Sequence, residues 1–202
     1  NNIIICYNIS IRGGHMNKRT LFSREEMLES LIKTLKERTV SVEEIAEVAF
    51  RQQSKWSDDI SMKTCIDSVE KILSLRDTFH ILQLGAEIDR LTDEGVFQGP
   101  IYQILKSDLG MFGIDELFGL EIAGLYGTIG KTNFGDIDVN KPLVVDRLNG
   151  DGKHEGGMCH TFMDDIVGAL AAAASTRVAQ MTNEDEARKD PLVEEIKLDL
   201  DI

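Results

Sequence analysis

The chain has 202 residues, of which 42% are hydrophobic and 28% are charged, and its formal net charge at pH 7 is −13. That length predicts one domain with a substantial core, and the composition is typical of a globular protein. The negative charge argues against a nucleic-acid partner and against passive adhesion to anionic membranes, because both require clustered Lys and Arg. No segment approaches the roughly 20 apolar residues of a membrane-spanning helix.

The cysteines indicate a reducing environment. Cys6, Cys65 and Cys159 form an odd and scattered set without a disulfide pattern. Because disulfide frameworks belong to oxidising compartments, we expect a cytoplasmic protein, with peripheral contact to a membrane as a second option.

Residues 1–15 are interpreted as a leader that is foreign to the natural protein. His15-Met16 is what a common cloning site encodes, and the segment lacks the basic start of a signal peptide. Residues 16–182 are predicted to form a single domain. Residues 183–202 are mainly acidic and are expected to be a solvated, partly disordered tail.

The first half of the chain has the start signals of helices. Ser23 with Glu26, and Ser41 with Glu44, each have the spacing of a capping box, in which either side chain bonds the backbone N–H of the other residue. No stretch alternates polar and apolar residues long enough to indicate a sheet. This half is therefore predicted to be an all-α scaffold.

Two further helices are expected before position 100. One is predicted to start at Ser57, with Asp58 and Asp59 in a first turn favoured by the helix dipole. The buried positions at helical spacing are predicted to be Cys65, Val69 and Ile72, followed by Ile81, Leu84, Ile88 and Leu91. Gly95 is a natural stop for the second helix.

The character of the sequence changes after Gly110. Eleven of the 17 glycines fall between Gly110 and Gly157, which predicts tight turns whose free backbone N–H groups suit oxyanions. A long helix follows, for which Thr161 with Asp164 is the predicted cap. Alanines dominate residues 169–174, and small side chains suit a central helix surrounded by others.

A repeated five-residue pattern indicates the chemistry. Residues 115–119 read Asp-Glu-Leu-Phe-Gly and residues 164–168 read Asp-Asp-Ile-Val-Gly. Because positions four apart share a helix face, each glycine clears room beside the first acid for a neighbouring helix or ligand. Crowded carboxylates favour a divalent cation with oxygen ligands. The candidate ligands are Asp115, Glu116, Asp138, Asp164 and Asp165. Asp115-Glu116 could equally be a solvated first turn of a helix, and Asp164 could serve only as a helix cap.

Lys141 is the candidate phosphate contact. It precedes a proline and is therefore expected to have an extended backbone, with its ammonium free to reach a phosphate and with Asp138 to orient it. The alternative is a surface turn whose ion pair is worth under about 1 kcal/mol. His160, and His154 in the loop before it, are candidates for a general acid.

The segment 127–132 contains Gly-Lys-Thr but is not an NTPase loop. Such a loop needs a glycine five residues before Gly130, where this chain has Leu125. A weaker role in holding phosphate is left for Thr128 and the amides near it.

Three ordered motifs resemble those of the bacterial phosphatidylglycerophosphatase A family. Residues 115–119 resemble its Asp-Glu-Phe-(Ile/Val)-Gly motif, and Phe134-(x)₃-Asp138-x-x-Lys141-Pro142 resembles its Phe-(x)₃-Asp-x-x-Lys-Pro motif. Residues 156–158 with 164–167 resemble its Gly-Gly-Met…Asp-Asp-Ile-Val motif. The chain is similar to the water-soluble, all-helical branch found in bacilli, which implies a helical bundle with a central Ala-rich helix.

The resemblance also implies an activity, the magnesium-dependent removal of phosphate from phosphatidylglycerophosphate. The membrane enzymes of the family are mostly transmembrane, so a related soluble phosphomonoester stays an alternative to the lipid head group. The implied metal is Mg²⁺, with Mn²⁺ as an option. The implied catalytic residues are Asp138, Lys141, His160, Asp164 and Asp165. The expected phosphate-binding groups are Thr128, Lys141, Gly156 and Gly157.

Two other classes of function stay open. One is a non-catalytic regulatory or assembly module that keeps the acidic core for packing or metal-linked folding. The other is an all-α nucleotide pyrophosphohydrolase, whose first motif Glu26-x-x-Glu29 fits weakly. In each case the alanine-rich helix predicts a homo-oligomer, a dimer or tetramer.

Overall fold

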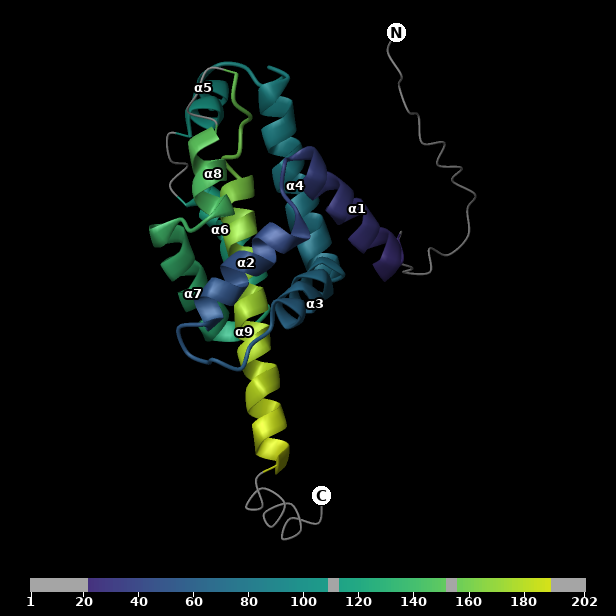
Figure 1. Ribbon diagram of the computed structural model, residues 1–202. Coiled ribbons are helices and arrows are strands. Elements are labelled where there is room, and N and C mark those ends of the chain that lie inside the picture. The colour runs from purple at the N-terminus through teal and green to yellow at the C-terminus, as the bar shows by residue number, and fades with distance from the viewer. Residues whose placement is uncertain (1–21, 109–112, 152–155, 190–202) are drawn as a thin grey trace, which may run out of the picture.

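The computed structural model describes residues 22–108, 113–151 and 156–189 (Figure 1). These ranges contain nine α-helices and no strand, which confirms the all-α prediction. In chain order the helices are α1 (Arg24–Glu37), α2 (Val42–Gln53), α3 (Met62–Leu73), α4 (Arg76–Asp93), α5 (Pro100–Ser107), α6 (Ile114–Gly124), α7 (Gly127–Asn140), α8 (Val144–Asp151) and α9 (Met163–Lys189). Within the described ranges, no helix is both long and apolar enough to cross a membrane.

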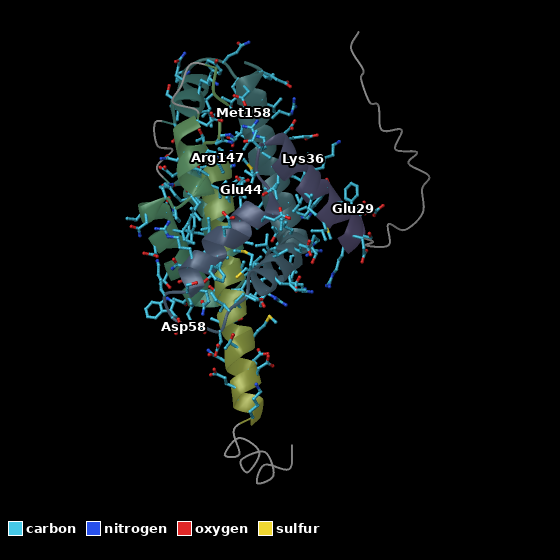
Figure 2. The ribbon with its side chains drawn as sticks, viewed as in Figure 1. Glu29, Lys36, Glu44, Asp58, Arg147 and Met158 are labelled. Carbon is cyan, nitrogen blue, oxygen red and sulfur yellow. The ribbon has the colours of Figure 1, made fainter. Side chains whose placement is uncertain are left out.

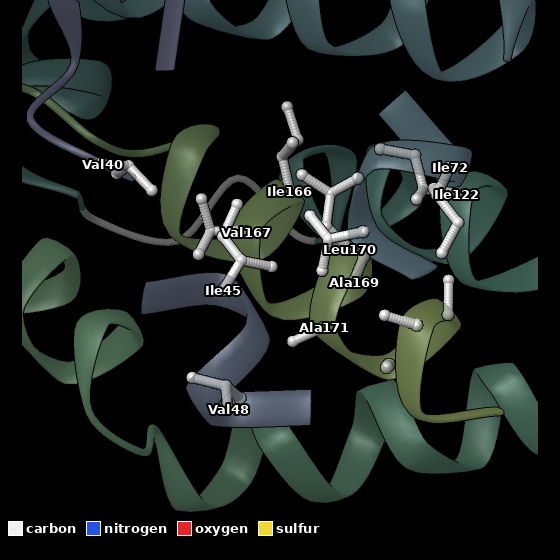
Figure 3. Close-up of a cluster of buried hydrophobic side chains, with 14 of the residues drawn as sticks. Val40, Ile45, Val48, Ile72, Ile122, Ile166, Val167, Ala169, Leu170 and Ala171 are labelled. Carbon is white, nitrogen blue, oxygen red and sulfur yellow. The ribbon is translucent and has the colours of Figure 1, made fainter. Parts of the chain in front are cut away.

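The long helix α9 organises the core. It packs against α2, α3, α4, α6, α7 and α8, and residues 159–176, which include its first half, are all buried. Figure 3 shows side chains of α2, including Ile45 and Val48, close to Val167 and Ala171 of α9. The alanines at 169 and 171–174 are fully buried, so several helices can approach the axis of α9 closely.

The capping boxes of α1 and α2 are confirmed. Ser23 Oγ accepts from the N–H of Glu26 at 3.2 Å, and Glu26 Oε2 accepts from the N–H of Ser23 at 2.7 Å. The same exchange at Ser41 and Glu44 has distances of 3.2 and 2.9 Å. Local sequence therefore determines where these two helices begin.

The predicted start of the third helix is wrong by several residues. α3 begins at Met62, and its N-cap is Ser61, whose Oγ accepts from the N–H of Thr64 at 3.1 Å. Ser57 instead accepts from the N–H of Asp59 at 3.3 Å, a local turn that competes with helix formation. The predicted burial of Cys65, Val69 and Ile72 is confirmed.

The buried face of α4 also differs from the prediction. Its buried residues include Leu82, Gly85, Ala86 and Asp89, whereas Leu84 is 54% exposed. The apolar residues Ile81, Ile88 and Leu91 are only partly buried. The side of α4 that meets α9 carries small and polar residues. A prediction from hydrophobicity alone therefore places the buried face about one residue away from the observed one. The stop is confirmed, because α4 ends at Asp93 and Gly95 has φ +67°.

The glycine-rich region is helical, not a series of turns. Residues 113–151 contain α6, α7 and α8, and Gly119, Gly124 and Gly130 among their glycines lie close to a neighbouring helix. A Cβ at Gly130 would lie 2.1 Å from the carbonyl oxygen of Ala123, so the N-terminal part of α7 touches the backbone of α6. The abundance of glycine was thus misread as loop chemistry.

The predicted leader and the predicted acidic tail lie largely outside the described residues. Residues 183–189, assigned to the acidic tail, belong to α9, whose C-terminal end extends beyond the other helices (Figure 1). Residues 190–202 and the leader 1–15 lie outside the described residues.

Two glycines of α7 provide a matched test of this packing. We expect Gly130→Ala to lower the free energy of unfolding by about 1–3 kcal/mol, because the new methyl meets fixed backbone. Gly135→Ala, whose Cβ would enter open space, is expected to raise it by up to about 1 kcal/mol through helix propensity. Urea unfolding followed by circular dichroism measures both. A tolerated Gly130→Ala would contradict the close α6–α7 contact.

Candidate functional site

The acidic residues of the repeated pattern meet at the ends of three helices. Asp115 and Glu116 lie in the first turn of α6, and Asp164 and Asp165 lie in the first turn of α9. Asp138 lies near the end of α7, which packs against both. Asp115, Asp164 and Asp165 are each only 5% exposed. The predicted convergence of carboxylates is thus a feature of the fold.

Three of these carboxylates form a group that could hold a cation. One oxygen from each of Asp115, Glu116 and Asp165 lies within 4.8 Å of the other two. Glu116 Oε2 is buried and has no hydrogen-bond partner among the described residues. Three converging carboxylate oxygens fit a hard divalent cation.

The aromatic ring of Phe134 explains the two glycines of the pattern. A Cβ at Gly119 would lie 2.5 Å from Phe134 Cζ, and a Cβ at Gly168 would lie 3.7 Å from Phe134 Cε2. The buried ring therefore occupies the space that Gly119 leaves. It is in ordinary contact with Gly168, where the atom nearest to an added Cβ is Ile137 Cγ2 at 3.3 Å. Asp138 lies one turn beyond Phe134 on the same face of α7, just as each glycine lies one turn beyond an acid. This register brings Asp138 to the carboxylates of α6 and α9.

Lys141 supplies the positive charge of the cluster. Its Nζ lies 2.5 Å from Asp138, 3.3 Å from Asp164 and 3.6 Å from Asp165. The prediction of an extended backbone is wrong, because Lys141 is the left-handed C-cap of α7 with φ 41° and ψ 60°. This conformation is uncommon for residues other than glycine. In it the side chain lies over the end of its own helix, where the three carboxylates compensate the strain.

The crowding of carboxylates shows in their pKa values. Burial, reinforced by Asp164 and only partly offset by Lys141, raises the pKa of Asp165 to about 9. Burial also raises the pKa of Asp164 to about 6, against the influence of Lys141. A shared hydrogen bond with Asp115, followed by burial, raises the pKa of Glu116. Without a further cation, the cluster therefore holds protons.

Lys141 stays charged in this setting. Burial acts to lower its pKa, but the carboxylates of Asp164, Asp138 and Asp165 together outweigh burial and raise the pKa above its usual value. One ammonium is thus a permanent part of the site.

Asp108 is a neighbour of the site that the sequence did not reveal. It is the left-handed C-cap of α5, with φ 48°, and its charge acts to raise the pKa of Asp164. The effect places it near the cluster. No motif or spacing distinguishes Asp108 from the many other acids of this chain.

Several predicted site residues lie elsewhere. Thr128 is exposed in the first turn of α7, about 15 Å along the helix axis from Asp138. Gly156 has φ +84°, and the carbonyl of Gly157 accepts a hydrogen bond from Lys106 at 3.1 Å. These contacts show no link from Gly157 to the acidic cluster. His154 lies outside the described residues.

His160 faces a different set of charges. It is 3% exposed, and its Nε2 lies 3.3 Å from a carboxylate oxygen of Asp151 in α8. Burial and the nearby Arg38 lower its pKa to about 4, against the opposing effects of Asp151 and Asp93. None of these neighbours belongs to the acidic cluster, so the side chain is a neutral, buried group beside α8.

The predicted cap of α9 is wrong. The hydroxyl of Thr161 donates to the carbonyl of Leu105 at 2.7 Å, and Asp164 accepts from the N–H of Asp165. The acceptor for the first N–H groups of α9 is the buried Asp89 of α4, which bonds the N–H groups of Phe162 and Met163.

The glutamates of the weak pyrophosphohydrolase motif are not part of a site. Glu26 is engaged in the capping box of α1. Glu29 lies on the surface of the same helix (Figure 2). Neither observation favours a role in metal binding.

Comparison with known proteins identifies the family. The family described as Phosphatidylglycerophosphatase A matches residues 60–180, a range that contains every carboxylate of the cluster and Lys141. The chain belongs to this family. The resemblance noted in the three sequence motifs is thereby confirmed.

Relatives share most of the chain. The uncharacterized protein YutG of Bacillus subtilis (strain 168) is 39% identical over 152 residues, which cover 75% of this chain and 90% of that protein. The crystal structure of protein ypjQ from Bacillus subtilis is 34% identical, with a TM-score of 0.75, and the match covers 81% of this chain and 99% of that one. A low temperature requirement C protein from Listeria monocytogenes is 36% identical, with a TM-score of 0.73 and coverages of 78% and 97%.

The lowered pKa of His160 predicts a pH-dependent stability. In the unfolded chain His160 titrates near 6.5 and in the folded protein near 4, so protonation favours unfolding as the pH falls between these values. We expect this group to contribute up to about 3 kcal/mol above pH 6.5, which is lost towards pH 4. The free energy of unfolding, measured by urea denaturation from pH 7.5 to 4.5, should decline less in His160→Gln than in the wild type, by the contribution of His160. His80→Gln, at an exposed histidine, should retain it, and an unchanged decline in His160→Gln would refute the assignment.

Proposed function

We propose that the chain is a metal-dependent phosphatase that hydrolyses phosphomonoesters. The observation that carries the proposal is the meeting of Asp115, Glu116 and Asp165 around one point beside Lys141. A cation held by the carboxylates and a fixed ammonium would together bind a phosphate. Membership of the phosphatidylglycerophosphatase A family supports this chemistry.

Mg²⁺ is the proposed metal, and Mn²⁺ is the proposed substitute. Both are hard cations that bind carboxylate oxygens and keep several water molecules. Asp115, Glu116 and Asp165 would hold the ion. When bound, such an ion activates water and polarises the phosphoryl group.

Lys141 is the proposed phosphate contact. Its ammonium is charged and fixed by Asp138 and Asp164, which leaves Asp165 for the metal group. These two aspartates would thus orient the lysine, and the lysine would neutralise charge on the phosphate. Thr128 and His160 receive no role, because Thr128 is exposed at the start of α7, far from Asp138, and His160 faces Asp151.

The proposed substrate is a phosphomonoester, either phosphatidylglycerophosphate or a related soluble compound. We further propose a cytoplasmic homo-oligomer. The alanines of α9 are buried within the chain itself, so the subunit interface would lie on another surface. A folded, metal-binding protein without activity on either substrate class would instead be a regulatory or assembly module.

Metal binding can be tested without a substrate. We expect Mg²⁺ or Mn²⁺ at about 100 times its Kd to stabilise the fold by about 2.7 kcal/mol, since only the native state has the site. For a domain of this size, that raises Tm by roughly 5–10 °C. NaCl at equal ionic strength controls for screening of the net charge. If the divalent ions raise Tm no more than NaCl does, the metal site is disproved.

Activity is tested by phosphate release from vesicles that contain phosphatidylglycerophosphate and from soluble phosphomonoesters, each with Mg²⁺. We expect Asp165→Asn to lower the rate at least about 100-fold, because it removes a metal ligand, and to leave the fold intact, because it relieves like-charge crowding. Asp67→Asn, the same change at an exposed residue of α3, should retain full activity. Equal rates for the two variants would count against the proposed centre.

A further inference from the structure

The start of α9 is anchored by another helix. The first N–H groups of any helix lack acceptors within that helix. Here the N–H of Phe162 lies 3.2 Å from both carboxylate oxygens of Asp89, and the N–H of Met163 lies 3.0 Å from Asp89 Oδ2. The N–H of Asp164 bonds the carbonyl of His160, and that of Asp165 bonds the side chain of Asp164. All four donors are therefore accounted for, and a residue of α4 serves two of them.

Asp89 belongs to a stripe of three residues along α4. Gly85, Asp89 and Asp93 are spaced four apart and so share one face of the helix. At Gly85, a Cβ would lie 2.4 Å from the side chain of Ile166, so α4 and α9 are in direct contact there. At Asp93, Oδ1 accepts from the N–H of Cys159 at 2.8 Å. The stripe thus contacts Cys159 before α9, Met163 at its first residue and Ile166 in its first turn.

The two aspartates of this stripe are themselves held in place. Arg38, the C-cap residue of α1, donates to Asp93 Oδ2 at 3.1 Å and to the carbonyl of Cys159. Lys106 of α5 donates to Asp93 Oδ1 at 3.2 Å and to the carbonyl of Gly157. The thiol of Cys159 donates to Asp89 Oδ1 at 3.6 Å. Asp89 is fully buried, so neither solvent nor rotamer exchange loosens the contact.

We propose that Asp89 is a positioning residue for the metal centre, an inference that rests on the proposed function. Its carboxylate fixes the axial position of the first turn of α9. That turn carries Asp164 and Asp165. Of the three carboxylates that could hold the cation, Asp165 is the one that α9 supplies. A displacement of this turn would separate Asp165 from Asp115 and Glu116 of α6. Asp89 touches neither the proposed metal nor the proposed substrate, so it acts only through α9.

The test compares the metal affinity of variants that are all folded under the conditions of the measurement. Mn²⁺ binding to the full chain is measured by calorimetry, each variant well below its own Tm. We expect Asp89→Ala to raise the Kd for Mn²⁺ about 10-fold or more, in the range seen when a residue that orients a metal ligand is removed. Asp89→Asn keeps one acceptor oxygen and should give an intermediate Kd. Leu82→Ala, a buried position on the same helix, should lower Tm without changing the Kd.

A second measurement follows the anchored amides directly. Hydrogen exchange at Phe162 and Met163 should be slow in the wild type and in Leu82→Ala, and fast in Asp89→Ala. Should Asp89→Ala fail to fold, Asp89→Asn is used for both measurements. Unchanged Mn²⁺ affinity and unchanged exchange in the Asp89 variants would overturn the inference while leaving the proposed function intact. A wild type that binds no Mn²⁺ would overturn the proposed function, and with it the metal-positioning role; the exchange data would then decide only whether Asp89 anchors α9.

Discussion

The site depends on one aromatic ring packed against two glycines. Phe134 of α7 fills the space that Gly119 of α6 leaves open, and its ring also lies against Gly168 of α9. Because the ring fixes α7 relative to both neighbours, it also fixes the residues one turn away, which are the acids. The carboxylates therefore meet as a consequence of apolar packing. A side chain at Gly119 would have to displace the ring, and with it the register of α7 against α6.

Some of this arrangement could be predicted from sequence because the signals are local. The capping boxes at Ser23 and Ser41 involve residues three positions apart and formed as expected. The repeated acid-acid-apolar-apolar-glycine pattern correctly indicated two helix starts with a close neighbour beside each glycine. Sequence could not indicate that one phenylalanine is the neighbour of both glycines, because that contact joins three helices.

Except for the start of α3, which a local turn at Ser57 displaces, the errors concern positions whose conformation or burial is set by tertiary contacts. Leu84 is more hydrophobic than Gly85 or Asp89, yet Leu84 is exposed and the other two are buried. Gly85 is buried because α9 approaches α4 closely at that position. Asp89 is buried because the first N–H groups of α9 require an acceptor. Lys141 adopts a left-handed backbone against the usual preference before proline, because three carboxylates bind its ammonium. The glycines of α7 suggested turns, whereas the fold uses Gly130 for helix contact.

The polarity of the three helices explains why each charged residue stands where it does. The N-termini of α6 and α9 carry partial positive charge, which favours the acid doublets in their first turns, and the C-terminus of α7 carries partial negative charge, which favours Lys141 as its cap. The magnitudes show the limit of this compensation. Five carboxylates and one ammonium, all ionised, leave a charge of about −4, and two helix N-termini offset roughly one unit of it. The negative charge that remains is not compensated by the fold itself, so protons or a divalent cation must complete the site.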